Sequence, residues 1–359
     1  MILNSTVIEQ TIDRDERERF DKDLVVVRAP NASGEPTPLA MIRKRLHGIP
    51  RTKAPVVLIH GYGQNRYAWH LPSRSFFNYL ARAGFDVFNL ELRGHGRSRH
   101  LGAHPPRDPA VYVEEDVPAA LAEVARLSGG RPAYLVGHSL GGLIAYASAA
   151  AAPERVAGVV TLGSPYRFTR GSMSLKLFSK VLLAFDRRVD LGHGALELKP
   201  LSEAMRIMRG FIESPLFPLP IRGFAPHSLE PNILGQHMAL AMDTGSISVL
   251  RHLFMAAAEA SAGGHCLGEL TDFADEFEAL DLPLLVIAGT KDDLAPPASV
   301  EPAYHRSRST DKTYRCFPRG HIDLLAGRDC PQTIWPLVAS WLSARVRHAE
   351  RAVAATTES

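Results

Sequence analysis

The hydrophobic positions of this chain fall into short, uninterrupted apolar runs that are separated by helix-like stretches. Four such runs, each ending in turn residues, are VVLIHG from Val56, FDVFNLELRG from Phe85, AYLVGHS from Ala133 and VAGVVTLGS from Val156. Helical patterns lie at residues 73–83, 110–127 and 140–151. Continuous apolar runs are typical of strands that are buried on both faces of a parallel sheet. The pattern therefore predicts an α/β fold, with helices on both faces of a mostly parallel sheet.

This alternation of strand and helix is interrupted once and then resumes. Residues 164–282 carry helical patterns rich in Met, Phe and Leu, before LPLLVIAGT from Leu282, TYRCFP from Thr313 and a last helix at 332–348. Residues 24–28 and 39–46 predict an opening hairpin. We therefore expect a core at 24–163 and 283–359, a helical cap at 164–282 and an N-terminal extension at 1–23. The mixed-charge run 13–23 is interpreted as a solvated helix or arm, and the last residues, RAVAATTES, as a frayed end.

The most apolar stretch, residues 133–152, is long enough to cross a membrane. It nevertheless contains Gly137-His138-Ser139-Leu140-Gly141, at the point where a predicted strand meets a predicted helix. Glycines at this spacing allow a strained turn that holds a serine Oγ clear of the sheet, and the helix N-terminus below it supplies free N–H groups. We therefore interpret the stretch as buried core that presents Ser139 as a nucleophile, with no transmembrane segment.

Composition and charge exclude several classes of function. The chain has 359 residues, of which 41 are basic and 38 acidic, and this near balance predicts neither a nucleic-acid partner nor an acidic ligand. The cysteines Cys266, Cys316 and Cys330 form no C-x-x-C pair and are interpreted as reduced thiols. No metal is expected, because the chain has no H-E-x-x-H motif or carboxylate cluster, and no cofactor is expected either. The first residues do not resemble a secretory signal, so a cytoplasmic location is expected.

Two further motifs follow the first two strands of the predicted parallel sheet. The first is His60-Gly61-Tyr62-Gly63. We expect the backbone N–H groups of Tyr62 and Leu140 to form an oxyanion hole, and Gly61 and His138 to lie beside the substrate. A plain glycine turn is the alternative. The second motif, RGHGRS from Arg93, follows Glu91 and is interpreted as structural, because its arginine can pin the loop.

Taken in order, the motifs H-G-x-G, R-G-x-G-x-S and G-H-S-x-G-G resemble those of the α/β-hydrolase fold superfamily, over residues 56–163 and again over 282–342. The resemblance implies the chain order nucleophile, acid, histidine. The family's G-x-x-D pattern places the acid at Asp292, with Asp293 as the alternative, and the Gly-His context after TYRCF places the base at His321. If Asp292 is the acid, Asp293 is expected to cap the next turn or to face solvent. Glu91 stands where the family more often has Asp, and no catalytic consequence is expected.

A serine at the nucleophile position argues against relatives that use Asp there, such as haloalkane dehalogenases and epoxide hydrolases, and against synthases that use Cys. The sequence therefore predicts a serine hydrolase of the carboxylesterase or lipase kind. It would cleave a small carboxylic ester with a lipophilic acyl or alcohol part through an acyl-enzyme. The alternatives are a thioesterase or polyester-oligomer hydrolase and, from another class, a non-catalytic binding protein on the same fold.

Apolar stripes in the predicted cap bear on the substrate. They comprise Leu175, Phe178, Leu182 and Phe185; then Leu198, Leu201, Met205, Met208 and Ile212; and, within residues 246–262, Val249, Leu250, Leu253, Phe254 and Ala257. One interpretation is that these side chains pack the cap onto the core, and the other is that they line an adaptable acyl-chain pocket. The basic residues of the first stripe's helix, Lys176, Lys180 and Arg187, would also allow weak contact with lipid surfaces.

Overall fold

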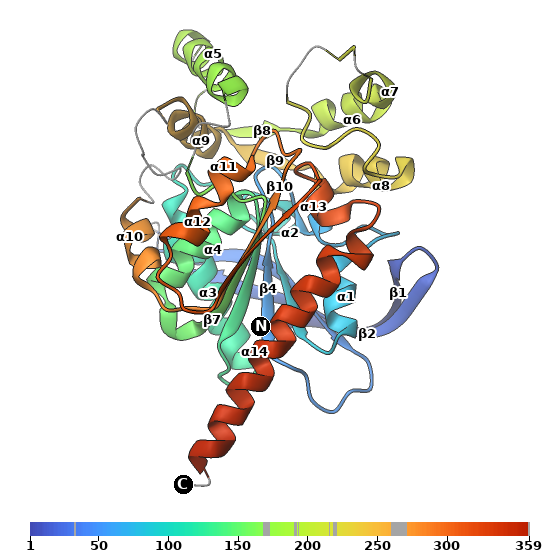
Figure 1. The fold of residues 1–359 in the computed structure, drawn as a ribbon, viewed down its shortest axis with the longest axis vertical. Helices are drawn as coiled ribbons and strands as arrows, with labels where there is room; N and C mark the ends of the chain where they lie inside the picture. The colour runs from blue at the N-terminus through green and yellow to red at the C-terminus, as the bar shows by residue number, and fades with distance from the viewer. Residues whose placement is uncertain are drawn as a thin grey trace.

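The fold is built on one nine-stranded sheet in the order β1-β2-β3-β5-β4-β6-β7-β10-β11. Figure 1 shows helices packed around this sheet. It is seen in a computed structural model, which describes every residue except 32–33, 168–172, 190–191, 193, 215, 218–220, 260–270 and 358–359. The strands are β1 (Ile2–Asp13), β2 (Glu16–Ala29), β3 (Thr37–Leu46), β4 (Pro55–Ile59), β5 (Asp86–Leu90), β6 (Ala133–His138), β7 (Val156–Leu162), β10 (Leu284–Gly289) and β11 (Lys312–Phe317). All neighbouring pairs from β5 to β11 are parallel, and the pairs from β1 to β5 are antiparallel. The predicted fold class is confirmed.

Helices cover both faces of this sheet because alternate strand residues point to opposite faces. In β4, Val57 and Ile59 face the layer that contains α3 (Val117–Leu127), α4 (Leu140–Ala151) and α10 (Thr271–Ala279). Val56 and Leu58 face the opposite layer, which contains α1 (Phe76–Arg82) and α14 (Ile334–Thr357). The strands are therefore buried on both sides, which explains their continuous apolar sequences.

The apolar stretch at 133–152 belongs to this core, as predicted. Every residue of β6 is buried, and so are the ten residues of α4 from Leu140 to Ala149. Among the described residues, no helix combines the length and the apolar character that a membrane crossing requires.

Two expectations at the chain ends are wrong. The charged run 13–23 forms no helix or arm, because β1 and β2 pair as a long antiparallel hairpin with a turn at Arg14, where φ is 53°. Its charges fit this ribbon, since Arg17 lies 3.8 Å from Glu9 on the opposite strand and much of the ribbon is exposed. At the other end, α14 continues to Thr357, which is consistent with the high helix propensity of alanine in RAVAATT.

The predicted opening hairpin is present as β2 and β3, and it is longer than expected because β2 begins at Glu16. Residues 1–23, expected to form an extension, therefore lie in the same sheet as the core, as β1 and the first part of β2.

The segment predicted as a cap lies mainly over the carboxyl ends of the parallel strands (Figure 1). Its elements are α5 (Met173–Val189), β8 (Ala195–Glu197), α6 (Lys199–Ile207), α7 (Arg209–Ile212), α8 (Pro231–Gln236), a π-helical turn (His237–Ala241), β9 (Thr244–Ser246) and α9 (Ile247–Glu259). It is mostly helical, as expected, but β8 and β9 pair as a small antiparallel sheet that the sequence did not predict. The last helix of the predicted cap range, α10, packs on the core beside α4, where the Phe277 and Tyr146 rings lie 4.7 Å apart.

Candidate active site

Ser139 stands at the sharp turn between β6 and α4. Its backbone has φ 53° and ψ −122°, a conformation that non-glycine residues rarely adopt. The turn leaves no space for larger neighbours, because a Cβ on Gly137 would lie 2.3 Å from the Gly141 carbonyl oxygen. A Cβ on Gly141 would lie 2.2 Å from the Ile59 carbonyl oxygen. Both glycines of the motif are therefore required, and strain at the serine accompanies this close packing.

His321 and Asp292 meet in the space beside this turn. Asp292 follows β10 and His321 follows β11, and the His321 Nδ1 lies 2.8 Å from the Asp292 Oδ2. Both side chains are buried. The second carboxylate oxygen, Oδ1, accepts hydrogen bonds from the backbone N–H groups of Leu294 (2.9 Å) and Ala295 (2.7 Å). The carboxylate is thus oriented by the backbone, and it holds the imidazole with the proton on Nδ1, which leaves the lone pair on Nε2.

Burial alone would lower the pKa of His321, but the negative charge of Asp292 and its hydrogen bond outweigh this effect. Asp293 and Asp323 act in the same direction, and the net result is a pKa above the ordinary value of 6.5. The site therefore stabilises the imidazolium that forms when His321 takes a proton.

This raised pKa predicts the acid side of the pH–activity profile. If His321 is the base, as the sequence leads us to expect, it must be neutral to accept a proton, so kcat/KM should rise with pH through a midpoint above 6.5, the value from which the pKa of His321 is displaced. The measurement is kcat/KM for a soluble aryl ester from acidic to mildly alkaline pH. A midpoint at or below the ordinary histidine value, in protein that stays folded over the range, would contradict the assignment.

Asp293 occupies a different environment from the one expected. Its carboxylate accepts hydrogen bonds from the backbone N–H groups of Arg222 (2.6 Å) and Gly223 (3.0 Å). It therefore neither caps the next turn nor faces solvent, and it fastens the segment around residue 222 to the core. No local pattern signals this role, because the bonded residues lie about seventy positions away in the sequence. Burial raises the pKa of the Asp293 carboxyl.

His138 was expected to lie beside the substrate, and it does line the same cavity as Ser139. Its ring also has a structural contact, because Nε2 lies 3.2 Å from the backbone carbonyl oxygen of His321 and donates to it. Burial and the neighbouring His321 lower the pKa of His138 well below its ordinary value, so it is a neutral donor. His138 thereby holds the backbone of the residue expected to act as the base.

The loop after β4 carries the expected oxyanion donor, Tyr62. A Cβ on Gly61 would lie 2.9 Å from the Gln64 Oε1 and 3.2 Å from the Ser139 Cβ, so a larger residue at position 61 would crowd both side chains. The N–H of Gly61 donates to the Gln64 Oε1 (3.2 Å). Among the described residues, no backbone carbonyl receives the N–H of Tyr62. Leu140 is the first residue of α4, a position whose N–H has no intrahelical acceptor.

A cavity of about 270 Å³ contains Ser139, His321, Tyr62 and Leu140 in its lining. The other side chains that line it are mainly apolar, and they include Leu143, Ile221, Met242, Leu250, Leu253, Phe254, Ala257 and Leu294. Four of these, Leu250, Leu253, Phe254 and Ala257, belong to α9 and to the third predicted stripe. The hydroxyl and imidazole groups therefore open into a predominantly apolar space.

The other two predicted stripes behave differently. In the second, Ile212 is buried, but Leu201 and Met208 are 59% and 50% exposed, so this stripe neither packs fully on the core nor lines the cavity. In the first, Leu182 is half-buried, and the side chains of Leu175, Phe178 and Phe185 lie outside the described residues. On the same helix, Leu177 and Val181 are exposed beside Lys180, and contact of this helix with lipid surfaces stays a prediction.

The remaining sequence expectations concern metals, thiols and the loop after β5. Within the described ranges, no group of three or more His, Cys, Asp or Glu side chains is arranged to hold a metal ion. Cys316 and Cys330 are free, and Cys266 lies outside the described residues. Arg93 does pin its loop, because its Nε donates to the Asp116 Oδ1 at 2.7 Å.

Comparison with known proteins gives a consistent result. Residues 54–327 match the family model described as alpha/beta hydrolase fold. The pimeloyl-[acyl-carrier protein] methyl ester esterase of Sodalis glossinidius is 29% identical over 241 residues, which are 67% of this chain and 76% of that protein. Epoxide hydrolase B of Mycobacterium tuberculosis is 32% identical over 127 residues, so the match covers 34% of this chain and only 33% of that protein.

Solved structures resemble the fold over most of the chain. A highly thermostable carboxyl esterase from Bacillus coagulans, in complex with glycerol, has a TM-score of 0.61 at 18% identity and covers 90% of this chain and 99% of its own. A monoacylglycerol lipase from Paleococcus ferrophilus has a TM-score of 0.55 at 19% identity, with 86% and 99% coverage. At such identities the likeness concerns the fold alone.

Proposed function

This chain belongs to the α/β-hydrolase fold family, and on that premise we propose that it is a serine hydrolase of carboxylic esters with a lipophilic acyl or alcohol part. Ser139 is the proposed nucleophile, His321 the base and Asp292 the acid. The observation that carries the proposal is the buried pair of His321 and Asp292, 2.8 Å apart, in a cavity that also contains the strained serine.

The geometry supports a two-step acyl transfer. Asp292 fixes the proton of His321 on Nδ1, so Nε2 takes the proton from the Ser139 Oγ as the oxygen attacks the ester carbonyl. The N–H groups of Tyr62 and Leu140 stabilise the oxyanion of the tetrahedral intermediate. His321 then gives the proton to the leaving alcohol. In the second step it activates a water molecule, which releases the carboxylic acid and restores the serine.

The identity of the nucleophile distinguishes the proposed ester hydrolysis from the epoxide hydrolysis named for one relative. An epoxide hydrolase of this family uses an aspartate at the nucleophile turn, whereas this chain has Ser139. The match to that relative covers about a third of each chain. We therefore propose ester hydrolysis and not epoxide opening. A thioesterase would form the same acyl-enzyme, and parallel assays of aryl esters and acyl-CoA thioesters distinguish the two activities.

The apolar lining predicts a preference for longer acyl chains. Each additional buried CH₂ contributes about 0.8 kcal/mol, or roughly fourfold in kcat/KM, until the cavity is filled. On a panel of aryl esters from acetyl to dodecanoyl, kcat/KM should therefore rise beyond acetyl. The change Leu253→Trp reduces the cavity, and it should lower kcat/KM for the longer esters by about tenfold or more and leave acetyl ester hydrolysis nearly unchanged.

The matched control for this prediction is Leu201→Trp, which adds the same bulk to an exposed side chain of the cap, 59% exposed and outside the cavity lining. It should leave the chain-length profile unchanged. A wild-type preference for acetyl esters, or an equal loss on all esters in Leu253→Trp, would refute the acyl-pocket assignment.

A further inference from the structure

The loop that carries Tyr62, residues 60–66 (the Tyr62 loop), is hydrogen-bonded to the cap along much of its length. The N–H of Asp243 donates to the Gly63 carbonyl oxygen (2.8 Å), and the N–H of Asn65 donates to the Ala241 carbonyl oxygen (3.0 Å). Between these bonds, Gln64 and Met242 form an antiparallel bridge. The cap residues just before β9 therefore pair with the loop much as a short strand would.

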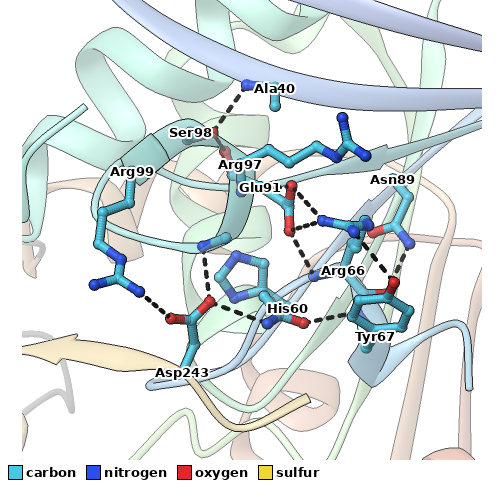
Figure 2. A network of polar contacts seen from close by, with 12 residues as sticks. Ala40, His60, Arg66, Tyr67, Asn89, Glu91, Arg97, Ser98, Arg99 and Asp243 are labelled. Carbon is cyan, nitrogen blue, oxygen red and sulfur yellow. Dashed lines mark hydrogen bonds and ion pairs between the residues drawn. The ribbon is translucent and has the colours of Figure 1, made fainter. Parts of the chain in front are cut away.

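The Asp243 side chain strengthens this pairing (Figure 2). Its Oδ2 accepts from the Asn65 Nδ2 (3.0 Å) and from the N–H of Gly96 (2.8 Å), the first residue of α2 (Gly96–His100). Its Oδ1 accepts from the N–H of Thr244 (2.8 Å) and from Arg99 (3.3 Å). Burial alone would raise the pKa of Asp243, but these bonds outweigh it and the pKa is lowered, so the carboxylate stays ionised at neutral pH. One charged group thus joins the Tyr62 loop, α2 and the cap.

Tyr62 itself is attached to β9 through its side chain. The Tyr62 hydroxyl donates to the Ser246 carbonyl oxygen (3.0 Å). A Cβ on Gly245 would lie 2.4 Å from the Tyr62 Cζ and Oη, so the ring packs directly on the backbone of the strand. The residue that carries the proposed oxyanion donor is therefore held by the cap at its side chain as well as through its neighbours in the loop.

The core holds the same loop from the other side (Figure 2). The Arg66 Nη1 donates to the Glu91 Oε1 (2.9 Å), and Glu91 also accepts from the N–H of Arg97 (3.0 Å). His60 accepts the N–H of Leu92 at Nε2 (3.3 Å) and donates from Nδ1 to the Gly61 carbonyl oxygen (2.9 Å). Burial, with a smaller effect of His95, lowers the pKa of His60 to about 3, so this ring stays neutral.

We propose that Asp243 is a positioning residue of the oxyanion hole, which fixes the direction of the Tyr62 N–H through Asn65 and Gly63. An oxyanion donor contributes only when its hydrogen points at the developing charge, within normal hydrogen-bond distance. The peptide plane before Tyr62 can rotate unless the residues after it are held. Residues 241–246 of the cap therefore help to position the oxyanion hole. This inference rests on the proposed function.

Two near-isosteric changes test this role. Asp243→Asn replaces one of two acceptor oxygens by an amino group that faces backbone and side-chain donors, and Asn65→Asp places a carboxylate oxygen against the Asp243 Oδ2. Since losing a whole oxyanion donor costs about 10²- to 10³-fold in kcat, a misaimed donor should lower kcat about 10- to 100-fold. KM should stay within about twofold for acetyl and for longer esters, because no residue that lines the acyl cavity is changed.

The matched control is Glu197→Gln. Glu197 also contacts Arg99 (3.1 Å) and the Thr244 hydroxyl (3.0 Å), but no hydrogen bond or ion pair joins its side chain to the Tyr62 loop among the described residues. This variant should keep the kcat of the wild type. A trifluoromethyl ketone distinguishes positioning of the oxyanion donor from a purely structural role of Asp243, because its adduct with the serine carries an oxyanion. Its inhibition constant should weaken by the same factor as kcat in both test variants and remain unchanged in Glu197→Gln.

The proposal is overturned if a folded Asp243→Asn or Asn65→Asp protein keeps both kcat and ketone affinity, or if only KM changes. If Asp243→Asn does not fold, Asn65→Asp carries the test. Failure of the underlying function is separate and visible in the wild type, which would then neither hydrolyse esters nor react with a fluorophosphonate at Ser139.

Discussion

Replacing Ser139 by alanine is expected to leave the fold intact and to lower ester turnover by several orders of magnitude. Alanine and serine are similarly disfavoured at φ 53°, so the substitution adds no backbone strain and the turn is retained. The proposed acyl-enzyme can then no longer form, and removal of the nucleophile in a serine protease lowers kcat on the order of 10⁶-fold. The measurement is kcat for an aryl ester, with circular dichroism and thermal unfolding as tests of folding.

Ser164→Ala is the matched control for this change. Ser164 is a buried serine close to the same turn, where a Cβ on Gly142 would lie 1.9 Å from its Oγ, and it does not line the cavity. This variant should keep most of the activity. Near-normal turnover in a folded Ser139→Ala protein would remove Ser139 from the mechanism.

The second large effect separates two neighbouring aspartates. Asp292 faces the His321 Nδ1, whereas Asp293 accepts from the backbone of Arg222 and Gly223. In Asp292→Asn an amide replaces the carboxylate that holds the imidazole in its productive tautomer, and we expect a loss on the order of 10⁴-fold in kcat. Asp293→Asn weakens an acceptor of two backbone hydrogen bonds, and these bonds lie away from the reacting atoms. Its kcat should therefore fall by less than about tenfold.

Asp293→Asn should instead lower the unfolding temperature, because a partly buried charged acceptor of two backbone N–H groups is weakened, at a cost of about 1 to 2 kcal/mol. The two variants differ by one position in the sequence, so each is the control of the other. The reverse ranking of their kcat values would transfer the acid role to Asp293. Small losses of kcat in both folded variants would show that another residue is the acid.

The parts of the fold that the sequence predicts well are those with local signals. The buried strands appear in the sequence as continuous apolar runs. The turn at Ser139 needs glycine at fixed positions, because Gly137 and Gly141 lie too close to other backbone atoms to carry a side chain. The positions of Asp292 and His321 follow strand ends, so a parallel sheet brings them to one edge although they are 29 residues apart. Resemblance to the family supplied their order.

The parts that the sequence did not predict depend on partners that are distant along the chain. Asp243 lies in a segment without a motif, and its acceptor contact with Asn65 spans 178 positions. Helical periodicity indicated an apolar face on both α9 and α6. It could not show that the apolar face of α9 lines the cavity, whereas the apolar face of α6 is largely exposed. The charged first hairpin was missed because its charges are arranged for an exposed ribbon, where no apolar alternation is needed.

Whether Ser139 is the nucleophile is tested most directly by labelling the wild-type protein with a fluorophosphonate, followed by peptide mass spectrometry. One covalent adduct is expected, on the peptide that contains Ser139, with loss of ester hydrolysis in proportion to labelling. No adduct is expected in Ser139→Ala. An unlabelled protein that still hydrolyses esters, or a stoichiometric adduct on another residue that abolishes activity, would show that Ser139 is not the nucleophile.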